Sequence, residues 1–262
     1  MPTVFLVFST DLDELLTVPN DGGTVTLTLD RRASIKDIIE SLGVPHTEVG
    51  RLLIIDTEVD FSHIPANGER ISVLAQAPPT DVLVPSTLRP VPLPAIRFLV
   101  DINVAKLAPL LRMVGMDATF SNPAADTYLA DLACTQQLIL LTRDTALLKR
   151  ARVVHGHLVR AVAPRAQLRE IIDLYGLRHL LRPFSRCMAC NTPLAPVAKE
   201  SVNHRLEPLT KKYYHEFQRC TRCHRIYWAG SHRDRMEKEL ENLLAIDPAA
   251  GNSPLPTAGF KK

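Results

Sequence analysis

No part of the sequence is apolar for long enough to cross a membrane. Apolar runs such as residues 138–141 and 52–55 fall far short of the roughly 20 residues that a membrane-spanning helix needs. The first residues, from Met1 to Leu6, also lack a basic segment ahead of their apolar residues and a small-residue cleavage site. We therefore expect no membrane span, no export and a cytoplasmic location.

The sequence is also poor in cysteine. Its 262 residues include only five cysteines, an odd number that cannot all pair in disulfides. Four of them form two C-x-x-C pairs, and the fifth, Cys134, stands within an apolar helical pattern. There we expect a small buried side chain. This usage fits a reducing compartment better than a disulfide framework.

Neither sign of charge dominates the whole chain, but each dominates one part of it. The net charge is +3. Residues 1–80 contain twelve acidic and five basic side chains, a balance of −7, whereas residues 178–235 contain twelve basic and four acidic side chains, a balance of +8. The basic end favours a polyanionic partner, and the acidic start argues against uniform coating of a nucleic acid.

The first 78 residues predict a small mixed domain of strands around one helix. The strand-like segments are residues 3–9, 24–29, 51–56 and 70–75. The turn-forming residues 20–23 predict a hairpin between the first two strands. Ser34, with Asp37 three residues on, predicts a capped helix start, and Gly43 marks its end.

This order of elements is typical of a β-grasp fold, and the segment resembles the ubiquitin-like sulfur carrier proteins. Those carriers end in a Gly-Gly whose carboxylate is activated. Here the chain instead continues through Pro78 and Pro79, so we do not expect sulfur transfer. The following segment, residues 79–95, is rich in proline and predicts an extended, semi-stiff linker.

From residue 96 the pattern changes to alternating strands and helices. We expect strands at residues 97–100, 116–120 and 138–142, and helices at residues 104–114, 126–136, 145–150 and about 165–174. Strands separated by helices of this length imply parallel pairing. Pro109 should kink or weaken the first of these helices. The tail, residues 247–262, is expected to be disordered.

Acidic side chains follow two of the predicted strands. Asp101 ends the first strand and Asp144 follows the third, so neighbouring parallel strands would bring both to one edge of the sheet. Asp126, which opens the intervening helix, is the third carboxylate expected there, and Asp131 is a weaker candidate. Clustered carboxylates can be held together by Mg²⁺ or Mn²⁺, which can activate water for phosphodiester hydrolysis.

A simpler interpretation exists for each of these side chains alone. An aspartate after a strand is often only a helix N-cap or a turn former. Arg143 could hold a substrate phosphate, but it could equally be exposed or paired with a carboxylate.

Four cysteines, Cys187, Cys190, Cys220 and Cys223, have the spacing of a zinc ribbon. Two C-x-x-C pairs offer four thiolates, which suits tetrahedral Zn²⁺ and leaves no open coordination position. We therefore predict a structural zinc, with redox dithiol chemistry as the alternative. The 29 residues between the pairs predict a hairpin or basic arm.

Basic and aromatic side chains surround these cysteines. The candidate substrate-binding residues here are Arg186, Arg222, Arg225, Tyr227 and Trp228. Cations beside aromatic rings suit a flexible single strand of nucleic acid, which offers phosphates and stackable bases. Trp228 could instead fill the core of a small domain.

Six motifs follow one another from residue 98 onward. They are residues 98–101 (FLVD), 107 with 110–117 (LLRMVGMD), 141–144 (LTRD), 186–191 (RCMACN), 220–223 (CTRC) and 227–232 (YWAGSH). Together they resemble the Mut-seven C-terminal RNase family. The resemblance implies a PIN-like nuclease followed by a zinc ribbon, with a ubiquitin-like domain in front. It also implies that Asp101, Asp126 and Asp144 occupy the acidic active-site positions and that Asp117 is structural. Pro109 and the lack of a fourth acid after Asp144 depart from the family pattern.

The sequence therefore predicts an α/β protein of several domains. They are a β-grasp domain (1–78), the linker (79–95), a PIN-like RNase domain (96–182), a zinc ribbon with a basic arm (183–240) and the tail (247–262). We expect a Mg²⁺- or Mn²⁺-dependent endoribonuclease acting on single-stranded or structured RNA. The alternative is an RNA-binding or ribosome-associated adaptor with a degenerate nuclease site, whose ubiquitin-like domain contacts a protein partner.

Overall fold

The computed structural model describes residues 1–120 and 125–245, which form two compact units. The first unit contains residues 1–105, 119–160 and 173–176, and the second contains the described part of residues 106–118, 161–172 and 177–262. The predicted tail lies outside the described residues. Within them, no helix combines the length and apolar character needed to cross a membrane.

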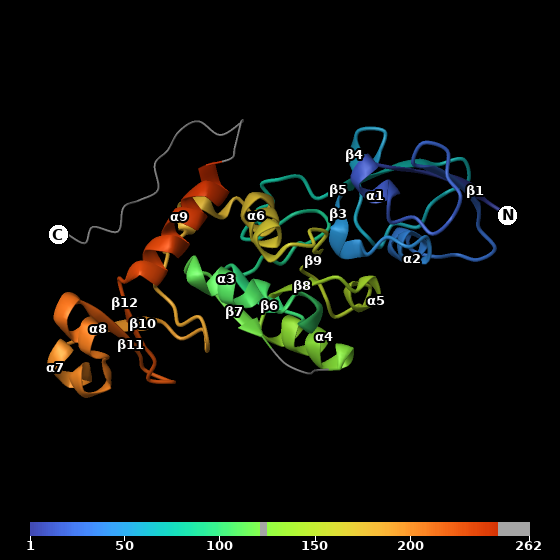
Figure 1. Ribbon diagram of the computed structural model, residues 1–262. Coiled ribbons are helices and arrows are strands. Elements are labelled where there is room, and N and C mark those ends of the chain that lie inside the picture. The colour runs from blue at the N-terminus through green and yellow to red at the C-terminus, as the bar shows by residue number, and fades with distance from the viewer. Residues whose placement is uncertain (121–124, 246–262) are drawn as a thin grey trace. The chain divides into compact units, whose positions relative to one another are not determined.

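The N-terminal sheet has five strands in the order β2-β1-β5-β3-β4. Figure 1 draws this part of the chain in blue to cyan. Its strands are β1 (Thr3–Phe8), β2 (Thr24–Thr28), β3 (Val49–Ile54), β4 (Thr57–Glu58) and β5 (Arg70–Ala75). Its helices are α1 (Thr10–Asp13), α2 (Ile35–Ser41) and a 3-10 turn, η1 (His46–Glu48). The predicted hairpin is confirmed, because β1 and β2 pair antiparallel, while β1 and β5 pair parallel.

The core of this sheet follows from its sequence pattern. Alternate residues of β1, namely Val4, Leu6 and Phe8, are buried, as expected for a strand with one face toward the core. The predicted cap of α2 is also confirmed, since the Ser34 hydroxyl accepts a hydrogen bond of 3.2 Å from the backbone N–H of Asp37.

The second sheet has four strands in the order β7-β6-β8-β9. Its strands are β6 (Arg97–Val100), β7 (Asp117–Phe120), β8 (Ile139–Thr142) and β9 (Gly156–Leu158). The helical elements of this region are η2 (Ile102–Val104), α3 (Leu107–Met113), α4 (Asp126–Thr135), α5 (Thr145–Leu148), α6 (Pro164–Leu174) and η3 (Leu177–Leu180). The β6–β8 and β8–β9 pairs run parallel, which confirms the predicted α/β core.

The effect expected of Pro109 depends on where the helix begins. The predicted helix starts at Val104, but in the structure η2 occupies residues 102–104 and α3 begins only at Leu107. Pro109 therefore lies in the first turn, where backbone N–H groups have no partner within the helix. The proline removes no helical hydrogen bond there.

The prediction that Cys134 is buried is wrong. Cys134 is exposed, because α4 packs its Leu129, Ala130 and Ala133 side chains inward. A residue next to Ala133 points about 100° away around the helix axis.

The proline-rich segment is partly buried in the first unit, and its Leu88 joins the core of the N-terminal domain. Its Val82, Leu88 and Leu93 are buried. From this segment the guanidinium of Arg89 donates hydrogen bonds to the carbonyl oxygens of His46, Thr47, Val49 and Val154, at 2.9 to 3.2 Å. The first three carbonyls belong to the N-terminal domain and the fourth precedes β9, so the partly buried guanidinium of Arg89 bonds to both of these segments of the first unit.

The third sheet belongs to the second unit and is antiparallel, in the order β10-β11-β12. Its strands are β10 (Leu194–Val197), β11 (Phe217–Cys220) and β12 (Ile226–Trp228). The chain between the first two strands forms α7 (Lys199–Val202), η4 (Asn203–Arg205) and α8 (Pro208–Tyr213), and α9 (Ser231–Ala245) follows the sheet. This agrees with the predicted cysteine-rich ribbon.

Candidate functional site

Asp101 lies directly after β6, as predicted, and is only 6% exposed. Its Oδ1 accepts a hydrogen bond from the backbone N–H of Ile102 at 2.6 Å. Its Oδ2 accepts from the amide of Asn103 at 2.7 Å and from the hydroxyl of Thr142 at 2.6 Å. These contacts fix the carboxylate in one orientation and still leave an oxygen lone pair for a further ligand.

Asp144 lies two residues after β8, the parallel neighbour of β6. Its Oδ1 accepts hydrogen bonds from the backbone N–H groups of Ala146 and Leu147, at 2.8 and 3.1 Å. Asp144 is therefore the N-cap of α5, and Asp101 caps η2 in the same way. Asp101 and Asp144 are therefore both helix N-caps, as the simpler interpretation predicted. The capping bonds of Asp144 use only its Oδ1, so its Oδ2 takes no part in them.

Thr142 links the two aspartates. Its hydroxyl donates to Asp101 and accepts from the backbone N–H of Asp144 at 3.0 Å and from the amide of Asn103 at 3.0 Å. The side-chain oxygen of Asn103 in turn accepts from the backbone N–H of Arg143 at 3.0 Å. The ends of β6 and β8 therefore share one polar network, and sequence analysis had not identified Asn103 or Thr142 as members.

Asp126 opens α4 and forms an ion pair of 3.6 Å with Arg150. Asp131 is paired instead with Arg152 at 2.5 Å, and both of these side chains are exposed. Across residues 1–120 and 125–245, the four cysteines are the only group of three or more side chains placed to share a metal ion, and their ligand atoms all lie within 4.8 Å of one another. Asp101, Asp126 and Asp144 do not form such a group among these residues.

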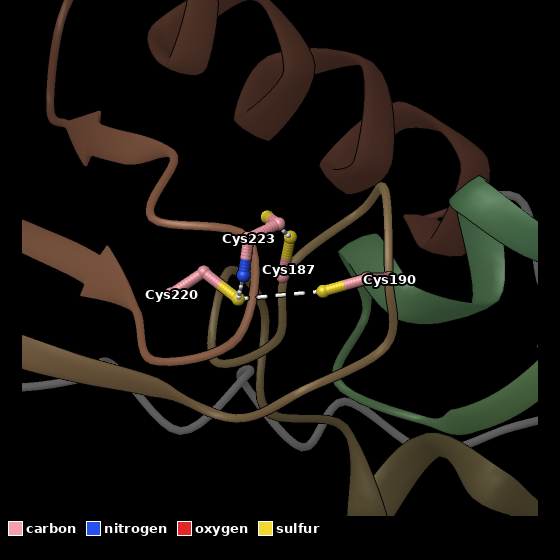
Figure 2. Close-up of side chains that lie close together, drawn as sticks. All are labelled: Cys187, Cys190, Cys220 and Cys223. Carbon is pink, nitrogen blue, oxygen red and sulfur yellow. Dashed lines mark hydrogen bonds between the residues drawn. The ribbon is translucent and has the colours of Figure 1, made fainter.

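The four cysteines converge from two loops, as Figure 2 shows. The Sγ atoms of Cys187 and Cys223 are 3.5 Å apart, and those of Cys190 and Cys220 are 3.3 Å apart. A tetrahedral zinc with Zn–S bonds of about 2.3 Å places its sulfurs about 3.8 Å apart. The arrangement therefore fits one Zn²⁺ with four protein ligands.

Two neighbouring side chains support thiolates at this site. A hydrogen bond with Thr192 lowers the pKa of Cys190 to about 6, which favours the charged form that binds metal. Burial and the contact with Cys187 raise the pKa of Tyr227. Its hydroxyl lies 3.1 Å from the Cys187 sulfur and, being protonated, can donate to it when that sulfur is a thiolate.

The first cysteine loop, residues 187–191, is fastened to α3 by a buried arginine. The Nε of Arg112 donates to the carbonyl of Ala118 at 2.8 Å, and its Nη1 donates to the carbonyls of Met188 and Ala189 at 3.1 and 3.0 Å. A buried guanidinium is tolerated only when its donors are satisfied. The cysteine loop provides two of these acceptors.

A second contact joins this loop to the start of β7. Asn191 donates to Asp117 at 2.6 Å and accepts from the backbone N–H of Ala118 at 3.1 Å. Arg186 donates to the carbonyls of Gly115 and Asn191 and lies 3.4 Å from Asp117. Asp117 thus has the structural position expected of it, and Arg186 is largely engaged within the protein.

The remaining predicted substrate-binding residues lie nearer the surface. Arg143, Arg222, Arg225 and Trp228 are exposed, and Tyr227 is partly buried. Trp228 also packs against Phe217, with ring centroids 6.3 Å apart, so it combines a contact to the core with an accessible face.

These features define an α/β protein with a ubiquitin-like sheet, a parallel four-stranded core with aspartates at its strand ends, and an antiparallel sheet with a four-cysteine centre. Comparison with protein families gives the same result. The Mut7-C RNAse domain matches residues 96–240, and the Mut7-C ubiquitin domain matches residues 1–81.

The chain belongs to the Mut7-C RNase family, because the first match covers more than half of its length. The domain implies a ribonuclease with RNA as its substrate. The comparisons with curated proteins and with solved structures found no match.

Proposed function

We propose that the protein is an endoribonuclease that uses Mg²⁺ or Mn²⁺ at the carboxyl ends of β6 and β8. The observation that carries this proposal is the pair of carboxylates held at neighbouring strand ends. The Thr142 hydroxyl fixes that of Asp101, and the backbone N–H groups of Ala146 and Leu147 fix that of Asp144. Ligands of open α/β sheets bind at such edges. The Mut7-C RNase domain supplies the reaction class.

The donor set suits a hard cation. Carboxylate oxygens are the ligands that Mg²⁺ and Mn²⁺ prefer, and Asp101 and Asp144 would hold the ion. Asp126, which pairs with Arg150 in this structure, is the third ligand proposed and would have to leave that ion pair to reach the ion. When bound, such an ion activates water and stabilises the charge on the displaced oxygen. Asn103 and Thr142 would keep the Asp101 carboxylate oriented and restrict its rotation.

RNA would be held mainly by the basic second unit. The proposed contacts are Arg143 near the carboxylates and Arg222, Arg225, Tyr227 and Trp228 around the zinc centre. Arg186 was also predicted to bind RNA, but its guanidinium is engaged by Gly115, Asn191 and Asp117. Exposed arginines suit phosphates because their guanidinium groups keep their charge and present a planar set of donors. Four thiolate ligands leave the zinc no open position, so its role is structural.

A circular single-stranded RNA tests both the reaction and its cation dependence. The expected result is linearisation with Mg²⁺ or Mn²⁺ and none in EDTA, because an endonuclease needs no free end. Cleavage of linear RNA only would make the enzyme an exonuclease. Equal cleavage in EDTA would exclude the proposed cation. A brief EDTA exposure that leaves the zinc content unchanged separates the two metals.

One observation favours an RNA-binding adaptor as the second candidate. Within the described residues, Asp126 does not complete a three-carboxylate group with Asp101 and Asp144, and none of the three residues directly after Asp144 is acidic. In this case the ubiquitin-like domain would recruit a protein partner. Binding of RNA without cleavage under any divalent cation would support it.

A further inference from the structure

A cavity of about 710 Å³ lies within the second unit, beside β12 and the start of α9. Aromatic rings make up much of its wall, from Phe184, Tyr214, Phe217, Tyr227 and Trp228. This volume is within the range of pockets that bind small organic ligands. The carboxylates of the proposed nuclease site take no part in it.

Two of these rings border the same space. A Cβ atom added to Gly230 would lie 2.9 Å from Nε1 of Trp228 and 3.4 Å from the hydroxyl of Tyr214. Both side chains therefore approach Gly230 closely, and a larger residue would displace the indole. Trp228 remains 38% exposed, so part of its ring is available to a ligand.

Arg233 is the one permanently charged cation among the described residues that line the cavity, together with His215 and His232. Glu216 is the one acidic residue among those described lining residues. The guanidinium of Arg233 stacks over Phe184 at 4.8 Å and pairs with Glu237 at 3.2 Å. Its Nε is buried without a hydrogen-bond partner among the described residues, which is unfavourable for a charged donor.

We propose that this cavity binds one unpaired nucleotide of RNA, with its base on Trp228 and its phosphate toward Arg233 and His232. Aromatic rings stack on any exposed base, and a cation beside them attracts the adjoining phosphate. A base within a duplex is already stacked and cannot enter. The inference rests on the proposed function for its choice of RNA, and it makes single-stranded or looped RNA the preferred substrate.

Trp228 is the only tryptophan, so its fluorescence reports on this cavity alone. The zinc-loaded full chain is titrated with a single-stranded octanucleotide, with the matching duplex and with an abasic octamer of the same backbone. Quenching by the single strand alone is expected. Binding of the single strand without quenching, or equal quenching by the abasic octamer, would overturn the proposal.

Variants separate the loss of stacking on Trp228 from a loss of folding. Trp228→Leu should weaken single-strand binding about ten-fold at unchanged zinc content, and Trp228→Phe should restore most of it. Tyr213 is 62% exposed and outside the cavity, so Tyr213→Leu is the matched control. If Trp228→Leu and Tyr213→Leu bind alike, the cavity is not the site.

The outcome is independent of cleavage. If a single strand quenches the fluorescence but is never cut, the cavity binds a nucleotide and the proposed nuclease activity is rejected. If RNA is cut without quenching, the nuclease activity stands and the nucleotide site in the cavity is rejected.

Discussion

The hydroxyl of Thr142 donates a hydrogen bond of 2.6 Å to the carboxylate of Asp101, which lies 41 residues earlier in the chain. Parallel pairing of β6 with β8 brings the two residues together. The contact orients the carboxylate that the proposed function places at the cation, so Thr142 is a positioning residue.

Replacing Thr142 with Val keeps the shape of the side chain but removes this donor. The side-chain amide of Asn103 and the backbone N–H of Asp144 donate to this hydroxyl, and both lose that acceptor. We expect a loss of about 1–3 kcal/mol in the free energy of unfolding and a reduced cleavage rate. Thr142→Ser should retain both. Denaturant unfolding and cleavage assays measure these effects, and equal behaviour of Val and Ser would show that the hydroxyl has no positioning role.

Replacing Cys220 with Ser removes one of four thiolates from the closed site. The ribbon should lose its zinc and unfold, because a structural zinc contributes directly to folding. The exposed Cys134 provides the control, and Cys134→Ser should retain one zinc per chain. Elemental analysis after purification without chelator decides this, and wild type without zinc would contradict the assignment.

Arg112→Met would leave three carbonyl groups without their donor while keeping most of the side-chain volume. We expect destabilisation by roughly 3 kcal/mol and faster loss of zinc to a chelator, because two of these carbonyls belong to the first cysteine loop. The exposed Arg222→Met should leave zinc release unchanged. Equal release from both variants would show that Arg112 does not hold the loop.

Burial and the nearby charge of Arg89 lower the pKa of His155 to about 4. In the unfolded chain this group titrates near 6.5, so below that pH the unfolded state gains a proton that the folded state does not. The free energy of unfolding is therefore unaffected by this histidine above pH 6.5, and it falls by roughly 3 kcal/mol as the pH is lowered to 4. The difference between wild type and His155→Asn, measured by denaturation at pH 7 and pH 4.5, should show this loss; parallel curves would contradict it.

The local patterns of the sequence predicted most of the fold. The C-x-x-C spacing and the alternation of strands and helices need only neighbouring residues, and both were confirmed. The effect of Pro109 was predicted wrongly, because the spacing of apolar residues placed the start of the helix three residues before its start in the structure. Cys134 was misjudged because an apolar neighbourhood does not specify which helix face is buried.

The polar contacts of the sites could not be predicted in this way. Thr142 and Asn103 acquire their roles only when two strands pair, and Arg112 acquires its acceptors from a loop about 76 residues away. An arginine within the apolar run Leu110-Leu111-Arg112-Met113 was nevertheless a signal, since a charge on a buried helix face requires partners. The roles of Asp101, Asp126 and Asp144 in catalysis remain predictions.

The most direct test of the proposed nuclease compares Asp101→Asn and Asp144→Asn with Asp131→Asn, whose exposed aspartate pairs with Arg152. The measurement is the cleavage rate of a labelled single-stranded RNA in Mn²⁺, with folding checked by circular dichroism and RNA affinity by anisotropy. The first two variants should cleave at least about 100-fold more slowly with little change in affinity, and Asp131→Asn should match wild type. If Asp101→Asn and Asp144→Asn cleave as fast as wild type, these carboxylates are not the nuclease site.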